Sequence, residues 1–336
     1  MWKQILTIAC RIAGGYQRAF ITHPRAWLLK RFTIFTGGAG VLWALIILAL
    51  HFGQISHDRL EYSVNGAYPF GKAFQPGEIY ATTVADIMNH ELHSGFGWRP
   101  NDFFLWGPSL MADNNANRQL GIIMAMRETV RVFKDDLTKV SSDEYDLNLV
   151  IADTDFRNDA SRWILPSAES KYDDGILHLQ MYVSGLHTQP QISRRLNLRN
   201  VDLIQLFQTW IELLGDAHAE LYMTRKPDGS PLHCWEDDDY FYHAQGYAHV
   251  MYYMMQAVRR EYSDSIKDDP VLAQLFAETI EALGQAAQMK PLIVLDGSSK
   301  GVVANHRHDL DAYICEALQK MLSIRDELAR QSMPIG

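Results

Sequence analysis

Histidine is the residue type in this sequence with the clearest chemical use, because imidazole is the commonest metal ligand in proteins. The chain holds 13 histidines, and most of them follow residue 53. A metal site needs at least three such side chains to converge from separate helices. The alternative is that the histidines are hydrogen-bonded or face solvent. The residues that we predict as metal ligands are His90, His93, His243, His306 and His308.

The spacing of these histidines limits how they can converge. His90 and His93 are three positions apart on a predicted helix, so they share one face of it. They do not form the HExxH motif, so the mechanism of zinc proteases that use this motif is not indicated. His243 and His249 are six positions apart on another predicted helix, which places them on different faces. Any metal site must therefore be assembled from several helices.

Other chemical motifs carry less information. The acidic run 236–239 lacks the alternation and glycine of a calcium loop, so it predicts a solvated first helical turn. Residues 297–301 do not match the GxxxxGK[ST] phosphate-binding pattern and predict a hairpin turn. Cys234 and Cys315 either pair as a disulfide in an oxidising compartment or stay free. The catalytic residues and any cofactor therefore stay unknown at this stage.

An aromatic-rich loop follows the first helix predicted after the apolar segment described below. Exposed aromatic side chains beside a bilayer rest at the headgroup level or form a groove for a partner. The alternative is burial in the core of the domain. The side chains that we predict as partner or membrane contacts are Trp98, Phe103, Phe104 and Trp106.

Residues 33–53 contain no Asp, Glu, Lys or Arg and predict a transmembrane helix. At about 1.5 Å per residue, a helix of this length reaches the roughly 30 Å of a hydrocarbon core. A buried core helix and a cleaved signal peptide are the alternatives. The apolar stretch is longer than a signal peptide needs, and no convincing cleavage site follows it. We therefore expect an uncleaved anchor, followed by a turn-rich linker over residues 54–78.

Charge on either side of the span predicts its orientation. Residues 1–53 hold six basic and no acidic side chains, which leaves 25 basic against 40 acidic residues after them. The basic side stays in the cytoplasm, so residues 1–32, including an amphipathic helix over 2–20, are expected there. The rest is then a periplasmic domain of an inner-membrane protein. Its acidity argues against nucleic-acid binding.

Apolar residues at helical spacing dominate residues 79–332 and predict an all-α bundle. Residues 203–217 and 272–286 align without gaps at nine identities in fifteen, and each is followed by Asp-Gly-Ser and another amphipathic helix. This favours a duplicated helix–loop–helix unit, residues 200–262 and 270–331, although chance similarity between two leucine-rich helices is the alternative. A minor β-hairpin is predicted around the second Asp-Gly turn, over residues 292–304.

A set of motifs is spread over most of the domain that follows the linker. They are Gly97–Asp102, Asp113–Asn114, Asn117, Gln119–Gly121, Trp163–Glu169, Leu214–Asp216, Tyr240–Gly246, Pro291–Gly297 and Asn305–His306. Together these motifs resemble a family of proteobacterial single-pass inner-membrane proteins that is catalogued as a domain of unknown function. The resemblance implies no activity, cofactor or catalytic residue.

The sequence thus leaves three functional hypotheses. The first is a non-enzymatic envelope scaffold that binds inner-membrane lipid and either an envelope protein or a second copy of itself. The second is a metal-dependent hydrolase that acts on an envelope substrate through the predicted histidines. The third is a module that binds a lipid or small ligand in a cavity of the bundle.

Overall fold

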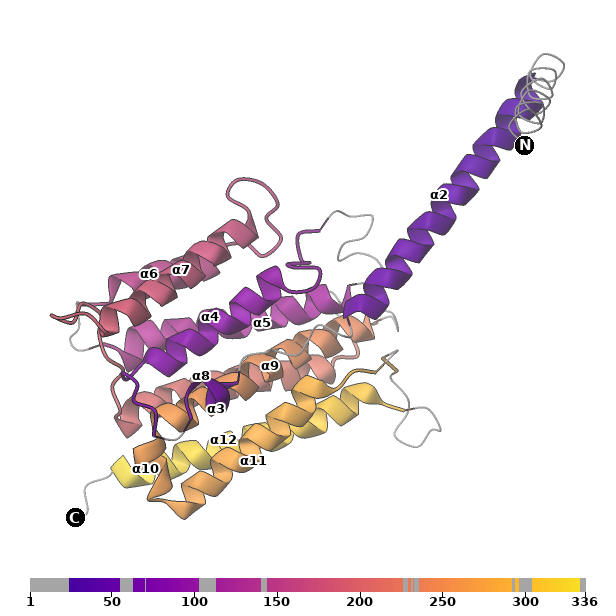
Figure 1. Ribbon diagram of the computed structural model, residues 1–336. Helices are drawn as coiled ribbons and strands as arrows, with labels where there is room; N and C mark the ends of the chain where they lie inside the picture. Colours follow the sequence, from indigo (N-terminus) through magenta and orange to yellow (C-terminus); the bar gives the residue numbers. More distant parts are fainter. Residues whose placement is uncertain are drawn as a thin grey trace, which may run out of the picture. The chain divides into compact units, whose positions relative to one another are not determined.

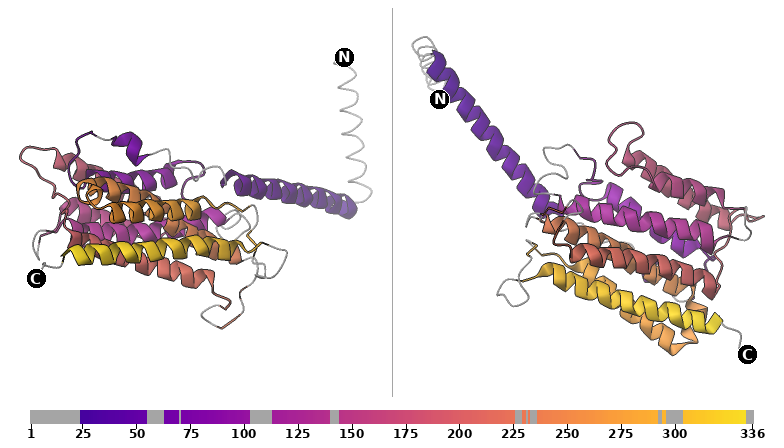
Figure 2. Two further views of the ribbon diagram at one scale, coloured as in Figure 1. Left: turned by 90° about the horizontal axis from the view of Figure 1, so that it is seen from below. Right: turned by 180° about the vertical axis from the view of Figure 1, so that it is seen from behind.

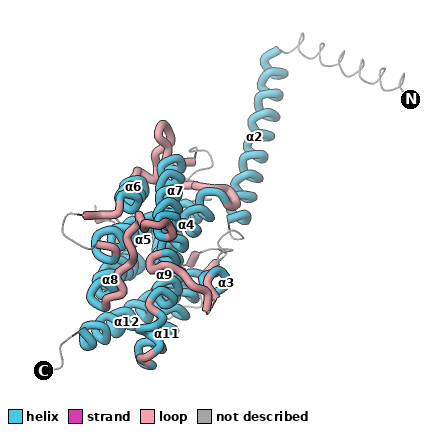
Figure 3. The backbone as a smooth tube through the Cα atoms, turned by 60° about the vertical axis from the view of Figure 1, so that its left-hand side comes forward, coloured by secondary structure: helices cyan, strands magenta, loops and turns pink. Residues whose placement is uncertain are grey.

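Helices make up all the regular structure of the described chain. No β-sheet is present among the described residues (Figure 3), so the predicted all-α fold is confirmed. The chain separates into two compact units, Met1–Leu50 and His51–Gly336, and each is described by itself. The computed structural model describes residues 24–54, 63–69, 71–102, 113–139, 144–225, 229–230, 232, 236–291, 294–295 and 304–332.

One long helix, α2 (Pro24–Gln54), forms the described part of the N-terminal unit. Proline suits the first position of a helix, because its fixed φ is already helical and its missing N–H would have no partner there. The segment Arg25–Ala49 is long and apolar enough to cross a membrane. The predicted span is thus helical, and its helix begins before residue 33. The amphipathic helix predicted over residues 2–20 lies outside the described residues.

The second unit is a bundle of helices packed side by side (Figure 1). The elements are α3 (Val64–Ala67), α4 (Glu78–His93), α5 (Asn114–Val132), η1 (Phe133–Leu137), α6 (Leu147–Phe156), α7 (Ala168–Leu186), α8 (Asn200–Leu221), α9 (Asp237–Glu261), α10 (Ser263–Lys267), α11 (Pro270–Gln288) and α12 (His306–Ser332). The predicted linker contains a short helix, α3, and helix α5 continues into a π-helical turn, η1.

The longer helices of the bundle form pairs that stack in layers. Helix α6 packs on α7, α7 packs on α4, and both α4 and α5 pack on α9. On the other side, α12 packs on α8 and α11 packs on α9. Figures 1 and 2 show the resulting order of pairs as α6/α7, α4/α5, α8/α9 and α11/α12. One continuous apolar core runs through these layers, which makes them a single cooperative unit.

Two glycines let α5 and α9 approach each other closely. A Cβ atom on Gly121 would lie 2.0 Å from the carbonyl oxygen of His243, and one on Gly246 would lie 2.2 Å from that of Arg118. Atoms cannot come so close, so only glycine permits this crossing. The contact fixes the position of Arg118 at the centre of the bundle.

The two segments of similar sequence occupy equivalent places. They form α8 and α11, and each is followed by a loop and a second helix, α9 or α12. Each first helix packs on the second helix of the other copy, α8 on α12 and α11 on α9. The equivalent residues Phe207 and Phe276 meet edge to face, with ring centroids 5.7 Å apart. This reciprocal packing is compatible with a duplicated unit, and the duplication stays a prediction.

Most of the predicted β-hairpin lies outside the described residues. At its described ends, the backbone N–H of His306 donates to the carbonyl of Leu295 at 2.9 Å. The N–H of Leu295 in turn lies 3.1 Å from Nδ1 of His306. This pair of contacts holds the start of α12 beside the chain that follows α11.

Candidate functional site

Three side chains with three different kinds of metal-binding atom meet between α8 and α12. They are His218, Asp311 and Cys315, and one nitrogen, oxygen or sulfur atom from each lies within 4.8 Å of the others. Within the described ranges, no other group of His, Cys, Asp or Glu side chains comes together in this way. We call these three residues the α8–α12 cluster.

Helical spacing explains why these side chains face one another. His308, Asp311 and Cys315 are three and then four positions apart on α12, so they lie on one stripe of that helix. His218 lies in the last turn of α8, and Tyr222 follows four positions later. The Tyr222 ring centroid is 5.0 Å from that of His218 and 4.9 Å from that of His308. The packing of α8 on α12 thus sets two polar stripes against each other.

One nitrogen of His218 makes both polar contacts of the imidazole within the cluster. Its Nδ1 lies 2.6 Å from Oδ1 of Asp311 and 3.2 Å from Sγ of Cys315. The thiol also donates to Oδ2 of Asp311 at 3.6 Å. In a catalytic triad the base uses one ring nitrogen for the nucleophile and the other for the carboxylate. This geometry does not provide that relay.

The electrostatics of the cluster favour a bound cation over a reactive thiol. Burial, and after it the negative charge of Asp311, raise the pKa of Cys315 to about 11. The thiol is therefore protonated at neutral pH and is a weak nucleophile. The charge of Asp311 is also the largest cause of a raised pKa at Tyr222. A cation would offset this charge and stabilise the thiolate.

The donor set of the α8–α12 cluster fits zinc. Thiolate sulfur, imidazole nitrogen and carboxylate oxygen are the three protein donors that Zn²⁺ accepts, whereas magnesium and calcium prefer oxygen alone. Three protein ligands leave one tetrahedral position for water or another side chain. Asp311 is buried and His218 is partly exposed, so an ion can enter from solvent on the side of the imidazole.

The five histidines predicted as metal ligands do not form such a group. His93 lies 3.4 Å from Asp173, and His243 lies 2.8 Å from Glu220. The His306 ring contacts the backbone of Leu295, as described above. The His308 ring meets that of Tyr222 edge to face beside the α8–α12 cluster. None of the five predicted histidines is a member of the α8–α12 cluster, although His308 lies beside it on α12.

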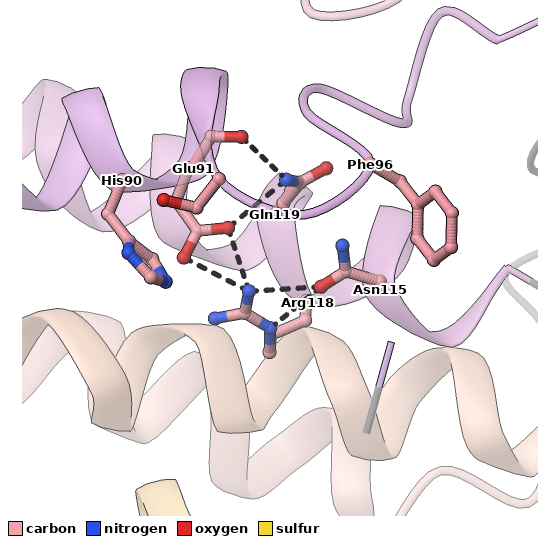
Figure 4. A pocket seen from close by; sticks show the side chains of 7 residues that line it. His90, Glu91, Phe96, Asn115, Arg118 and Gln119 are labelled. Atoms are coloured by element: carbon pink, nitrogen blue, oxygen red, sulfur yellow. Dashed lines mark hydrogen bonds and ion pairs between the residues drawn. The ribbon is translucent and has the colours of Figure 1, made fainter. Parts of the chain in front are cut away.

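His90 lines a pocket between α4 and α5 (Figure 4). Nη2 of Arg118 donates to both carboxylate oxygens of Glu91, at 3.0 and 2.7 Å, and Nε2 of Gln119 lies 3.1 Å from the same carboxylate. The cavity volume is about 10 Å³, which has room for roughly one water. These bonds tie Arg118, Glu91 and Gln119 to one another across α4 and α5, so we interpret the pocket as structural. The lining residues are His90, Glu91, Ser94, Phe96, Asn115, Arg118 and Gln119.

Trp98, predicted as an exposed contact, is buried in the core. Its indole N–H donates to the carbonyl of Ala160 at 2.9 Å, and its ring packs edge-on against Tyr172. Burial, the alternative reading of the aromatic loop, therefore describes Trp98. The other predicted contacts, Phe103, Phe104 and Trp106, lie outside the described residues. Cys234 does too, so the alternatives of a disulfide with Cys315 or two free thiols stay open.

A signal for the α8–α12 cluster was present in the sequence. The spacing His308-x-x-Asp311-x-x-x-Cys315 places three metal-binding side chains on one helical stripe. His218 could not be added from spacing alone, because it lies on another helix. Only the reciprocal packing of the two similar helix pairs brings α8 against α12.

Comparison with known proteins adds the family but no activity. Residues 65–228 and 223–331 match the DUF2333 family, described as uncharacterized protein conserved in bacteria, and together they cover most of the chain. No curated protein and no solved structure matches the chain. The expected membership of an uncharacterised bacterial family is thereby confirmed, and this chain belongs to the DUF2333 family of bacterial proteins.

Proposed function

We propose that this protein is a membrane-anchored, non-enzymatic scaffold of the bacterial envelope, and that a zinc ion clamps its two similar helix pairs together. The observation that carries the proposal is the meeting of His218 from α8 with Asp311 and Cys315 from α12. Helix α8 belongs to the first copy of the repeated unit and α12 to the second. An ion held by all three side chains therefore ties the two copies to each other.

The proposed anchor is residues 33–53 in the inner membrane, with the bundle in the periplasm. The apolar helix α2 supports it, because its segment Arg25–Ala49 is long enough to cross a bilayer. The basic residues before the span favour a cytoplasmic N-terminus. An alkaline phosphatase fused to the C-terminus should be active in cells, and a cytoplasmic reporter there should be silent. The opposite pair of results would reject this topology.

A scaffold is favoured over an enzyme by the chemistry of the cluster. Cys315 carries a protonated thiol, and His218 lacks the two-sided geometry of a base that activates a nucleophile. The pocket beside Glu91 is too small for a lipid or metabolite. The scaffold would act on an envelope protein or on a second copy of the chain. Chemical crosslinking in native membranes should trap that complex, and several crosslinkers that trap none would count against it.

Cobalt provides a direct test of metal binding, because tetrahedral Co²⁺ bound to thiolate absorbs light strongly. The full-length chain, purified in detergent under reducing conditions, should bind one Co²⁺ with a thiolate charge-transfer band, and Zn²⁺ should displace it. Cys315→Ser should abolish the band, and His218→Ala and Asp311→Asn should weaken binding by roughly 10- to 100-fold or more. A wild-type band that survives in Cys315→Ser would overturn the assignment.

His93→Ala is the matched control, because His93 contacts an acidic residue as His218 does but lies outside the α8–α12 cluster. This variant should bind cobalt as the wild type does. An equal loss of binding in His93→Ala and His218→Ala would show that the titration reports general histidine loss and not this cluster.

A metal-dependent hydrolase is the second candidate, and the free tetrahedral position favours it. Three protein ligands with one open site is the arrangement of catalytic zinc, whereas structural zinc usually has four protein ligands. Chelation separates the two roles. A clamp predicts that removal of the ion lowers the melting temperature, whereas a hydrolase predicts loss of turnover of an envelope substrate with little change in melting.

A further inference from the structure

The connection between α6 and α7 ends in an apolar tip that the proposed scaffold does not explain. Trp163, Ile164 and Leu165 are consecutive, and their exposed fractions are 65%, 64% and 88%. Figures 1 and 3 show this connection projecting beyond the ends of the two helices. Three adjacent large apolar side chains left in water carry a free-energy cost, so such a patch usually marks a binding surface.

The base of the tip is firmly held by residues of the core. The carbonyl of Asn158 accepts hydrogen bonds from Arg127 at 2.7 Å and from Tyr172 at 3.0 Å. The indole of Trp98 donates to the carbonyl of Ala160, the next but one residue. These bonds fix the path of the backbone into the tip.

The far side of the tip is held in the same way. The carbonyl of Arg162 accepts from the N–H of Ala168 at 3.0 Å and from the side chain of Asn101 at 3.2 Å. The apolar side chains are thus presented by an ordered backbone rather than by a loose loop. An ordered surface loses little entropy on binding, which is how a preorganised contact gains affinity.

We propose that residues 161–166 form a membrane-binding tip that inserts Trp163, Ile164 and Leu165 into the headgroup region of the bilayer. Indole favours the interface between lipid and water, while isoleucine and leucine favour the hydrocarbon beneath it. Arg162 is exposed beside them and can contact lipid phosphates. The nearest acidic side chain in the connection, Asp159, is engaged by the N–H and hydroxyl of Ser161.

A lipid surface is the favoured occupant because the same chain carries a helix that can cross a membrane. The chain from Gln54 to Ser63 spans at most about 30 Å when fully extended. Helix α4, which separates the residues near Ser63 from those that hold the tip, has 16 residues and is roughly 24 Å long. Neither length prevents contact between the tip and a bilayer, and the choice of a lipid surface rests on the proposed membrane anchor.

Fluorescence of the full-length chain in lipid vesicles tests this placement. The difference between the spectra of the wild type and Trp163→Phe isolates the emission of Trp163 from that of the other tryptophans. In phosphatidylcholine vesicles this difference emission should be shifted to the blue, quenched by brominated lipid and protected severalfold from aqueous acrylamide. Emission that is open to acrylamide and untouched by brominated lipid would overturn the proposal.

Charge variants at two exposed apolar sites give the matched control. Ile164→Asp should expose Trp163 to acrylamide, because a carboxylate in the tip resists insertion. Ile192, in the connection between α7 and α8, is 73% exposed, and Ile192→Asp should leave Trp163 quenched by lipid. Equal effects of the two variants would contradict a specific tip. Added anionic lipid should deepen quenching through Arg162, and quenching found only with anionic lipid would reject apolar insertion.

Discussion

Two groups of polar side chains lie between helices of this bundle, and they differ in how the negative charge of their carboxylate is compensated. Between α4 and α5, Arg118 and Glu91 are 3% and 1% exposed, and their opposite charges lie 2.7 Å apart. Between α8 and α12, Asp311 lies beside a neutral thiol and the partly exposed imidazole of His218. The first grouping contains its own cation, whereas the second has donors suited to one.

This difference separates a structural network from a binding site. A buried ion pair is costly to desolvate, so it persists only when both charges and their hydrogen bonds are satisfied within the protein. A cluster of thiol, imidazole and carboxylate gains more from a metal than from its own hydrogen bonds, because the metal takes the place of the thiol proton and binds all three groups at once. Removing one side chain of the first grouping should therefore destabilise the fold. Removing one side chain of the second should chiefly weaken metal binding.

The largest expected effect follows from breaking the charge-matched pair. Arg118→Ala leaves the Glu91 carboxylate buried without its cation, and the expected loss of unfolding free energy is about 3–5 kcal/mol. His218→Ala without metal should cost less than about 1 kcal/mol, because the side chain is partly exposed. Chemical denaturation of both variants in detergent measures the contrast.

A double variant shows whether charge is the cause. Arg118→Met combined with Glu91→Leu removes both charges and keeps apolar volume, so it should recover much of the stability lost in Arg118→Ala. A double variant as unstable as the single one would mean that packing, rather than charge balance, sets the cost.

Zinc should produce the next largest effect, and only at the α8–α12 cluster. A ligand at 100 times its dissociation constant stabilises the folded state by about 2.7 kcal/mol. The wild type and Arg118→Ala should both gain this amount, whereas Cys315→Ser, with its weaker residual affinity, should gain much less. Thermal melting with and without zinc makes the measurement. A gain in Cys315→Ser equal to that of the wild type would place the ion elsewhere.

The affinity for zinc should rise with pH. Cys315 must lose its proton to bind the ion, and the pKa of its thiol is raised to about 11. Below that value each pH unit therefore increases the apparent affinity by about tenfold. Cys315→Ser removes this proton, and its residual affinity should lose that dependence.

Sequence patterns predicted the helices of this protein better than the contacts between them. Apolar spacing defines a helix locally, so the helices at α4, α5, α8 and α11 could be expected from their own residues. The similarity of segments 203–217 and 272–286 also indicated that α8 and α11 are each followed by a comparable second helix. The π-helical turn η1 was missed, because hydrogen bonds that depend on tertiary packing leave no clear local pattern.

The site was harder to predict because its residues are separated in the sequence. His90 and His93 looked promising as a pair on one face, yet packing leads their side chains to different surroundings. Cys315 looked inert because no motif surrounds it. Its importance arises only when His218, far earlier in the chain, is brought to it by the packing of α8 on α12.

Glu261 provides an intermediate case, a buried carboxylate held by backbone groups instead of a cation. One of its oxygens accepts from the N–H groups of Gly77, Ile79 and Tyr80 at the start of α4, at 2.9–3.2 Å. Burial raises its pKa to about 7 from a reference of 4.5, and the hydrogen bonds only partly offset that rise. The folded state thus holds this proton more tightly than the unfolded state does.

The raised pKa of Glu261 makes its contribution greatest in acid. The contribution is complete below the unfolded pKa of about 4.5 and is lost as the pH rises through about 7. Between about pH 5 and about pH 8, the wild type should lose unfolding free energy of the order of 2 kcal/mol through Glu261. Glu261→Gln lacks the titrating group and should not show this loss. Urea unfolding of both proteins at these pH values isolates Glu261, because other titrating groups are common to both. Parallel pH profiles would show that Glu261 does not titrate in this range.

The smallest effect is expected where both partners of a polar contact are exposed. His93 and Asp173 lie 3.4 Å apart with each side chain about half in water. Solvent screens such pairs, so His93→Ala should change the unfolding free energy by less than about 0.5 kcal/mol. A larger loss, measured by the same denaturation as for Arg118→Ala, would mean that this contact belongs with the buried pair. Spacing along the sequence made His93 a better candidate metal ligand than His218. The position of His218 beside Asp311 and Cys315 reverses that order, and the small effect expected for His93→Ala tests it.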